Sequence, residues 1–114
     1  MTIQRGDIVL VDFPFIGQPE KSKIRPALIV QNDVGNQSSP HTIAIPITSA
    51  RERRIHPVQV RLPPSQDTGL KNASLADAGT IYTVPQDQLR RRIGQCPPEL
   101  MRQVDQALRI SLAI

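Results

Sequence analysis

Eleven prolines are spread along this chain of 114 residues and divide it into short segments. Proline has no amide hydrogen to donate and a fixed φ, so it ends helices and is confined to the edges, bulges and ends of strands. The apolar stretches between the prolines are short and rich in Val, Ile and Leu. The pattern therefore predicts short strands and many turns in one domain, residues 1–114, with one small core.

The expected strands follow from apolar runs and from alternation. Residues 7–13, DIVLVDF, are apolar on both faces, which predicts a strand buried on both sides. In VQVRL, Val58, Val60 and Leu62 alternate with polar residues, which predicts a strand with one buried face. Pro46 lies within another expected strand, so its nitrogen must face an edge, a bulge or the strand end. The remaining strands are expected at 26–31, at 42–47, in one or two pieces broken near Gly79 within 74–84, and at 89–94.

One helix is expected, at the C-terminal end of the sequence. Pro97 and Pro98 suit its first turn, and Glu99 complements the positive end of its dipole. Apolar side chains then form a stripe at helical spacing: Leu100, Met101, Val104, Ala107, Leu108 and Leu112. Exposed loops or turns are expected at 14–23, 32–40, 50–56 and 63–72. The predicted class is mainly β (α+β), a small and strongly bent β-barrel capped by a C-terminal helix.

Charge and cysteine content narrow the possible classes of function. A net charge of +4 favours a polyanionic partner such as nucleic acid, without requiring one. Cys96, the one cysteine, excludes an intrachain disulfide, favours a reducing cytoplasm and is expected to be a small apolar filler. His41 and His56 have no ligand-type neighbours at metal spacing, so no metal site and no cofactor are expected. Because no signal peptide or long apolar run is present, we expect a cytoplasmic protein with no membrane partner.

Three polar residues beside expected strands are candidates for phosphate chemistry. Pro26 keeps Arg25 in an extended conformation, where its planar fork of donors can bind a phosphate. A surface arginine in a local ion pair is the commoner use of such a residue. Thr48 and Ser49 end a strand, where a hydroxyl either caps a turn or donates to a phosphoryl oxygen. The residues alone leave both interpretations open.

Several motifs follow one another in an order and spacing that are more specific together than singly. They are Arg5-Gly6-Asp7-Ile8, Arg25-Pro26-Ala27-Leu28-Ile29-Val30, Gln31-Asn32-Asp33 with Asn36, Ile45-Pro46-Ile47-Thr48-Ser49, Gly69-Leu70 with Ser74, and Val104-Asp105-Gln106-Ala107-Leu108 with Ser111-Leu112. Through these motifs nearly the whole chain resembles the MazF/PemK/Kid family of type II toxin ribonucleases. The segment from Ala78 to Tyr82 departs from the family in a region that bears on base recognition, so no cut site is transferred.

The resemblance implies a fold, an activity and partners. The fold would be a twisted SH3-like barrel of the CcdB/PemK type with a C-terminal helix, assembled as a homodimer. The activity would be sequence-specific, metal-independent cleavage of single-stranded RNA by a toxin of a type II toxin–antitoxin system. In that reaction the 2′-OH attacks the adjacent phosphorus and leaves 2′,3′-cyclic phosphate and 5′-OH ends. A cognate MazE-like antitoxin would bind the same groove through a disordered, acidic tail.

The resemblance also assigns roles to individual residues. The family's catalytic pair falls on Arg25 and Thr48. Arg25 would stabilise negative charge, and an acid–base role for it is a family-based hypothesis, because a guanidinium is essentially always protonated. RNA would be held by the first loop, 15–24, and by the loop after Thr48. The RNA-binding residues expected are Glu20, Lys21, Ser22, Asn32, Ser49, Arg51, Arg53 and Arg54. Glu20 could equally be a solvated loop carboxylate, and the three arginines could equally form a solvated turn.

Other interpretations compete with the nuclease. His56 as a general base and Tyr82 as a platform for base stacking are less favoured than an exposed histidine and a half-buried strand residue. A gyrase poison like CcdB shares the barrel but relies on a C-terminal Trp, and this chain has no Trp. A catalytically inactive module that only binds RNA or an antitoxin stays open. A generic SH3-like adaptor would need more exposed aromatic side chains than the three aromatics here can supply.

Overall fold

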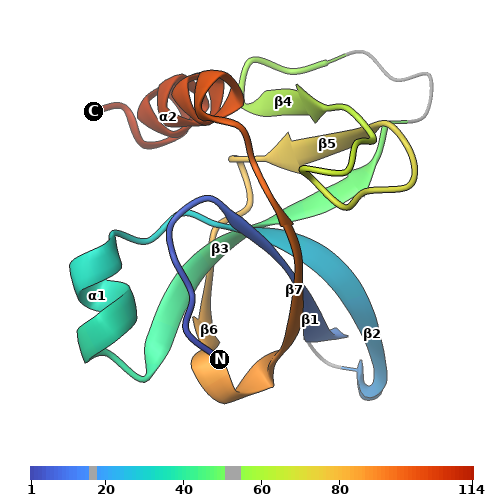
Figure 1. Cartoon of the computed structure of the whole chain (residues 1–114), viewed down its shortest axis with the longest axis vertical. Coiled ribbons are helices and arrows are strands. Elements are labelled where there is room, and N and C mark those ends of the chain that lie inside the picture. Colours follow the sequence, from blue (N-terminus) through green and yellow to red (C-terminus); the bar gives the residue numbers. More distant parts are fainter. Residues whose placement is uncertain (16–17, 51–54) are drawn as a thin grey trace.

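The computed structural model describes residues 1–15, 18–50 and 55–114, with residues 13–23 described by their backbone alone. Within these ranges the chain forms seven strands, two α-helices and one short 3-10 helix (Figure 1). They are β1 (Asp7–Phe15), β2 (Gln18–Ile29), α1 (Asp33–Ser38), β3 (His41–Ser49), β4 (Gln59–Leu62), β5 (Ser74–Asp77), β6 (Tyr82–Pro85), η1 (Gln86–Gln88), β7 (Leu89–Gln95) and α2 (Pro98–Leu112). The expected class, mainly β with a C-terminal helix, is confirmed.

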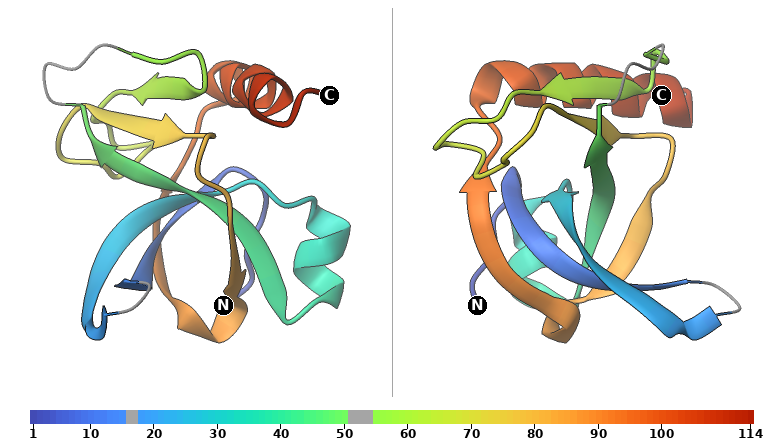
Figure 2. Two further views of the ribbon diagram at one scale, coloured as in Figure 1. Left: turned by 180° about the vertical axis from the view of Figure 1, so that it is seen from behind. Right: turned by 90° about the vertical axis from the view of Figure 1, so that its right-hand side faces the viewer.

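All pairs of strands are antiparallel and form one strongly bent sheet. Its strand order is β4-β5-β3-β2-β1-β7, and β6 also pairs with β3. Strand β3 joins the two halves of the sheet, because β6 pairs with its first residues and β5 with its last (Figure 2). Among the described strands no ladder connects β4 to β7. The segment 63–73 bridges these ends instead, and the Gln95 amide of β7 donates to the Asp67 carbonyl at 2.7 Å.

Successive residues of β1 face two separate cores. Ile8 packs in one core with Leu28, Ile45 and Val104 of α2, whereas Val9 packs in a second core. The second core contains Ile3, Val9, Val11, Ala27, Ile29, Ala44 and Val84. Because strand side chains point to alternate faces, β1 needs apolar residues on both. This confirms the prediction of a strand buried on both sides, and burial of each such side chain contributes about 2 kcal/mol.

The remaining strands and the last helix agree with the sequence pattern, apart from their ends. In β4, Val60 and Leu62 are buried and Arg61 is exposed, as their alternation predicts. The break near Gly79 separates β5 from β6. Helix α2 begins at Pro98 and packs against β4, with Val104 and Ala107 buried. Leu112 belongs to the predicted apolar stripe but is half-exposed, because it lies in the last turn of the helix.

The prediction of a loop at 14–23 is wrong for most of that range, which forms the ends of two paired strands. Strand β1 continues to Phe15 and β2 begins at Gln18, with these two residues opposite each other. The pairing of β1 with β2 continues through polar residues because each backbone satisfies the hydrogen bonds of the other. Residues 16–17 lie outside the described part of the chain. Glu20, Lys21 and Ser22 are therefore in a strand rather than in a loop.

The prediction of a polar turn at 32–40 is also wrong, because helix α1 lies within this range. The Asn32 side chain accepts a hydrogen bond from the Gly35 amide at 2.7 Å and so caps the helix. Asn36 is buried, and its Oδ1 accepts from the Thr42 hydroxyl at 2.7 Å and from the Gln31 amide at 3.0 Å. A cap and a buried amide network sustain this short helix, which has no apolar periodicity to reveal it.

Candidate active site

The candidate site lies where β2 and β3 separate. Their ladder ends with Ala27 opposite Pro46. The same register, continued by two residues, would place Arg25 opposite Thr48. Instead β2 stays with β1, and β3 goes on to pair with β5. Since Arg25 and Thr48 occupy matching register positions, their side chains leave the same face of the sheet on the two diverging strands.

Two prolines mark the divergence. Along β2 the Val30 amide donates to the Ile43 carbonyl of β3 at 2.9 Å, so every second residue, Pro26 included, turns its peptide toward β3. Pro26 has no hydrogen to donate, which ends this ladder. By the same alternation Pro46 turns its nitrogen to the opposite side, where pairing with β6 has stopped at Ala44 and pairing with β5 has not begun. Pro46 thus occupies the kind of ladder gap that the sequence required.

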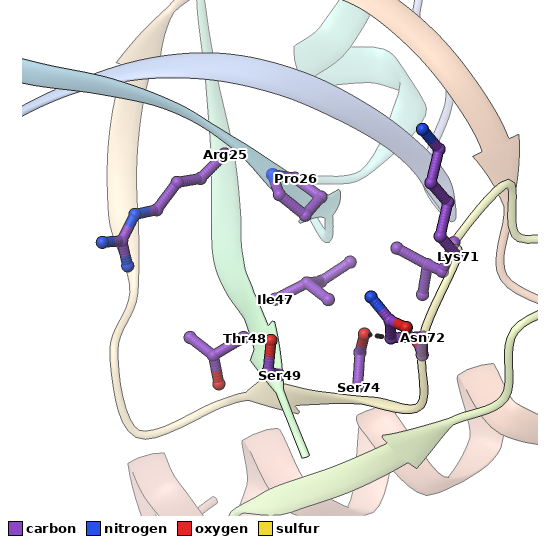
Figure 3. A pocket seen from close by; sticks show the side chains of 9 residues that line it. Arg25, Pro26, Ile47, Thr48, Ser49, Lys71, Asn72 and Ser74 are labelled. Atoms are coloured by element: carbon purple, nitrogen blue, oxygen red, sulfur yellow. Dashed lines mark hydrogen bonds between the residues drawn. The ribbon is translucent and has the colours of Figure 1, made fainter. Parts of the chain in front are cut away.

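A pocket of about 590 Å³ occupies this divergence (Figure 3). Its apolar surface comes from Pro26 and from Ile47 and Leu70, which are both buried. Its polar lining consists of Arg25, Thr48, Ser49, Lys71, Asn72 and Ser74. In Figure 3 Arg25 and Thr48 lie toward one side of the pocket and Lys71 and Asn72 toward the other. Arg25 and Lys71 carry positive charge, and no described lining residue is acidic, so the pocket favours an anion.

The wall opposite Arg25 comes from the segment 63–73. Thr68 is fully buried, and its hydroxyl donates to the Pro63 carbonyl at 3.0 Å and accepts from the Leu70 amide at 3.3 Å. Gly69 has a φ of +70°, and a side chain there would collide with the Ile93 carbonyl of β7. The backbone before the pocket residues is therefore held by a buried hydroxyl and by close packing against β7.

Lys71 and Asn72 are the lining residues that sequence analysis did not select. Only their neighbours, Gly69-Leu70 and Ser74, belong to the family-like motif. The available signal was weak, a Lys-Asn pair between that glycine and a strand. Their approach to β2 and β3 depends on the bend of the whole sheet, which no local pattern encodes.

The other predicted RNA-binding residues do not all reach this pocket. Ser49 lines it and is exposed. Asn32 is not among the lining residues, and its side chain caps α1. Glu20, Lys21 and Ser22 lie in the part of β2 that is described by its backbone alone. Arg51, Arg53 and Arg54 lie outside the described residues. An RNA contact at each of these positions stays a prediction.

The residues given less favoured roles lie away from the pocket lining. His41 and His56 are exposed, and Tyr82 begins β6 with 39% of its surface exposed. Cys96 is buried between β7 and α2. Burial, together with the negative charge of Glu99, raises the pKa of the Cys96 thiol to about 11. The thiol is therefore protonated at neutral pH, as suits a small apolar filler.

The described residues contain neither a group of metal-binding side chains nor a membrane-spanning helix. Within 1–15, 18–50 and 55–114, no three His, Cys, Asp or Glu side chains are grouped in a way that could hold a metal ion. No helix in those ranges is both long enough and apolar enough to cross a membrane. The site described here is therefore built from arginine, lysine, amide and hydroxyl groups.

Comparison with known proteins identifies the family. Residues 4–112 match the model described as the PemK-like, MazF-like toxin of type II toxin–antitoxin systems. The chain belongs to this family. It is also 32% identical over 114 residues to the endoribonuclease EndoA of Bacillus subtilis (strain 168), covering 100% of this chain and 97% of that protein. The predicted family and enzyme class, a MazF-like endoribonuclease toxin, are confirmed.

Solved structures of similar proteins agree with the fold. An endoribonuclease from a mycobacterial species, solved in complex with its cognate antitoxin, has a TM-score of 0.82 and 26% identity, over 98% of this chain and 96% of that one. MazF from Deinococcus radiodurans has a TM-score of 0.80 and 20% identity, over 100% of this chain and 99% of that one. The MazF-like fold therefore extends along the whole chain, and family membership favours a nuclease over a gyrase poison.

Proposed function

We propose that this MazF-like toxin cleaves single-stranded RNA at the divergence of β2 and β3, with Arg25 and Thr48 in contact with the scissile phosphate. One observation carries the proposal. The register of the sheet puts a guanidinium and a hydroxyl on the facing edges of an open pocket whose described lining has no acidic residue. A guanidinium binds phosphoryl oxygens through paired donors, and a carboxylate in the same place would repel them.

The chemistry proposed is transfer of the phosphoryl group within the RNA. The 2′-oxygen forms a bond to phosphorus, the bond from phosphorus to the 5′-oxygen breaks, and the products are a 2′,3′-cyclic phosphate and a 5′-OH. One proton leaves the 2′-OH and one reaches the 5′-oxygen. Arg25 and the Thr48 hydroxyl donate to the other phosphoryl oxygens as charge develops on them. The nucleophile belongs to the substrate, so the proposal requires no metal ion and no cofactor.

Proton transfer in this mechanism needs a group that accepts the proton of the 2′-OH and a group that supplies one to the 5′-oxygen. No carboxylate or imidazole stands among the described residues that line the pocket. A general base from those residues would have to be the side chain of Arg25 or Lys71, and a guanidinium gives up a proton only at high cost. We therefore assign charge stabilisation to Arg25. Its acid–base role stays the family-based hypothesis. If Arg25 does not transfer the protons, water molecules accept and donate them.

We also propose the partners that the family resemblance implies. The mycobacterial relative was solved with its cognate antitoxin, and MazF of Deinococcus radiodurans was solved with MazE. A cognate MazE-like antitoxin with an acidic tail would suit the cationic pocket by charge. The homodimer and a cytoplasmic location remain predictions. Sedimentation of the purified protein, alone and with a co-expressed antitoxin, measures both assemblies.

The test is cleavage of a long, sequence-diverse single-stranded RNA in EDTA, with cut positions and end groups mapped by sequencing. We expect discrete cuts with 5′-OH ends. Arg25→Gln and Thr48→Val should each lower the cleavage rate, by roughly 100- to 1000-fold where a charge-stabilising donor is lost. Arg102→Gln is the matched control, because Arg102 is an exposed arginine of α2 that does not line the pocket.

Each outcome is informative when thermal melting shows that the variants are folded. Cleavage by Arg25→Gln at the parent rate would reject the site assignment, and a requirement for added metal would reject the mechanism. If the parent cuts no RNA, the inactive binding module gains support, and inhibition of gyrase is measured next.

A further inference from the structure

We propose that Lys71 holds an RNA phosphate next to the scissile one, so that the strand crosses the pocket between Lys71 and the Arg25–Thr48 pair. This inference rests on the proposed function and adds the segment 63–73 to the RNA-binding surface. It assigns binding, and not chemistry, to Lys71.

The first support is the position and state of Lys71. It is exposed, it lines the pocket, and Figure 3 shows it on the side away from Arg25 and Thr48. Lys71 makes no hydrogen bond or ion pair with any residue that the structure describes. An ammonium in that state keeps its charge for a ligand, whereas a cation with a carboxylate neighbour is largely neutralised.

The second support is the hydrogen bonding of the backbone on either side of Lys71. Leu70 before it is buried, and its amide donates to the Thr68 hydroxyl at 3.3 Å. Asn72 after it has its carbonyl bound by the Ser74 hydroxyl at 2.9 Å. These hydrogen bonds hold the backbone next to the lysine in place, whereas its long side chain lets the ammonium adjust. Phosphate contacts from fixed positions set the register of a nucleic acid on a protein.

A third support is the chemistry between the two ends of the pocket. The surface there is apolar, formed by Pro26, Ile47 and Leu70. Such a surface suits the sugar and the face of a base, so one nucleotide can lie across it with a phosphate at each end. A lysine ammonium is a single point charge with rotatable donors, which suits a flanking phosphate better than the planar recognition assigned to Arg25.

Lys71→Gln tests this inference on the shortest RNA that contains the mapped cut site. We expect KM to rise about three- to fivefold near physiological salt, as for loss of one exposed ion pair, with kcat nearly unchanged. Binding is measured on the same RNA with a 2′-deoxy nucleotide at the cut, which removes the nucleophile. The slope of log Kd against log salt should fall by about 0.7, the amount for one phosphate contact on a single strand.

Two variants complete the experiment. Lys71→Arg keeps the charge and should restore most of the affinity and of the salt slope. Arg102→Gln removes one positive charge from α2 and should leave the slope unchanged, which separates a local contact from the effect of net charge. Thermal melting confirms that each variant is folded.

The outcomes separate this inference from the function on which it rests. If Lys71→Gln keeps the parent KM and salt slope, the inference is overturned and the nuclease stands. A fall in kcat with KM unchanged would place Lys71 in the chemistry and also overturn the inference. If the parent itself cuts no RNA, the proposed function is overturned, and the assignment of Lys71 falls with it.

Discussion

Two arginines of β7, Arg90 and Arg92, and one lysine of the pocket, Lys71, are all positive groups at the surface, but their surroundings differ. Arg90 Nη2 lies 3.1 Å from Asp12 Oδ2, and Arg92 Nη1 lies 3.6 Å from Asp7 Oδ2. Lys71 lines the pocket and makes no ion pair with any described residue, and none of the described lining residues is a carboxylate. A neutralised cation adds little to the attraction for a polyanion. The net charge of a chain therefore does not show which of its surfaces binds RNA.

The polar side chains of β7 stabilise the fold, because they surround the buried carboxylate of Asp7. Asp7 has no exposed surface, and its carboxylate accepts from the Gln4 amide at 2.8 Å and from Gln95 Nε2 at 3.0 Å. Together with Arg92 these donors tie the N-terminal segment, β1 and β7 to one another. Arginine therefore has two uses in this protein. Arg92 supports the packing of β7, and Arg25, by our proposal, binds the phosphate.

The largest effect on the structural side is expected from Asp7→Ala. This change leaves two donors and the Arg92 guanidinium without their acceptor, so the free energy of unfolding should fall by about 3 kcal/mol. Urea unfolding measures the loss, and the cleavage rate of the folded fraction should equal that of the parent. A large loss of cleavage with unchanged stability would show that β7 is part of the RNA-binding surface. The contrast between β7 and the pocket would then be wrong.

A smaller, pH-dependent effect is expected at Cys96, beside the same strand. Burial and Glu99 raise the pKa of its thiol from 9.0 to about 11, so the folded protein holds the proton more tightly than the unfolded chain. The thiol's contribution to stability is full below about pH 9 and is lost as the pH rises toward about 11, with about 1 kcal/mol lost by pH 10.

Urea unfolding at pH 8 and pH 10, compared between the parent and Cys96→Ala, isolates this contribution. The parent should lose about 1 kcal/mol more than the variant between the two pH values, since other groups titrate equally in both. Equal losses would show that the thiol does not titrate differently on folding, and the account of its burial would then be wrong.

The smallest effect is expected from Arg90→Gln. The Arg90 side chain is 57% exposed and its pair with Asp12 is screened by water, so the stability should change by less than about 1 kcal/mol. Cleavage and its salt dependence should not change, in contrast to Lys71→Gln. If the slope of log Kd against log salt fell as much as in Lys71→Gln, cations with and without a carboxylate partner would contribute equally to RNA binding.

The parts of the fold that the sequence predicted well are those encoded by local patterns. The two apolar faces of β1, the alternation in β4 and the buried stripe of α2 follow from which side chains must leave water. Helix α1 was missed because a cap at Asn32 and the buried amide of Asn36 replace an apolar stripe. The long hairpin of β1 and β2 was missed because backbone pairing, and not side-chain polarity, extends it.

The candidate site, like the fold, was predicted from the sequence only in part. Residue type and the prolines made Arg25, Thr48 and Ser49 candidates, and the resemblance to a toxin family gave them roles. Asn32 was predicted with them; its side chain caps α1, and its RNA contact stays a prediction, whereas Lys71 and Asn72 were not selected. The functional group of a residue is visible in the sequence, whereas its neighbours across the sheet are not.

The sequence by itself determined the short strands, the C-terminal helix and the kinds of group available for phosphate chemistry, because side-chain polarity and proline act on their own segment of chain. Only the tertiary structure decided that Arg25 and Thr48 share a pocket with Lys71. That meeting depends on where β2 leaves β3 and on how Gly69 seats the segment 63–73 against β7. Contacts between distant segments come from packing of the whole sheet, which no single segment encodes.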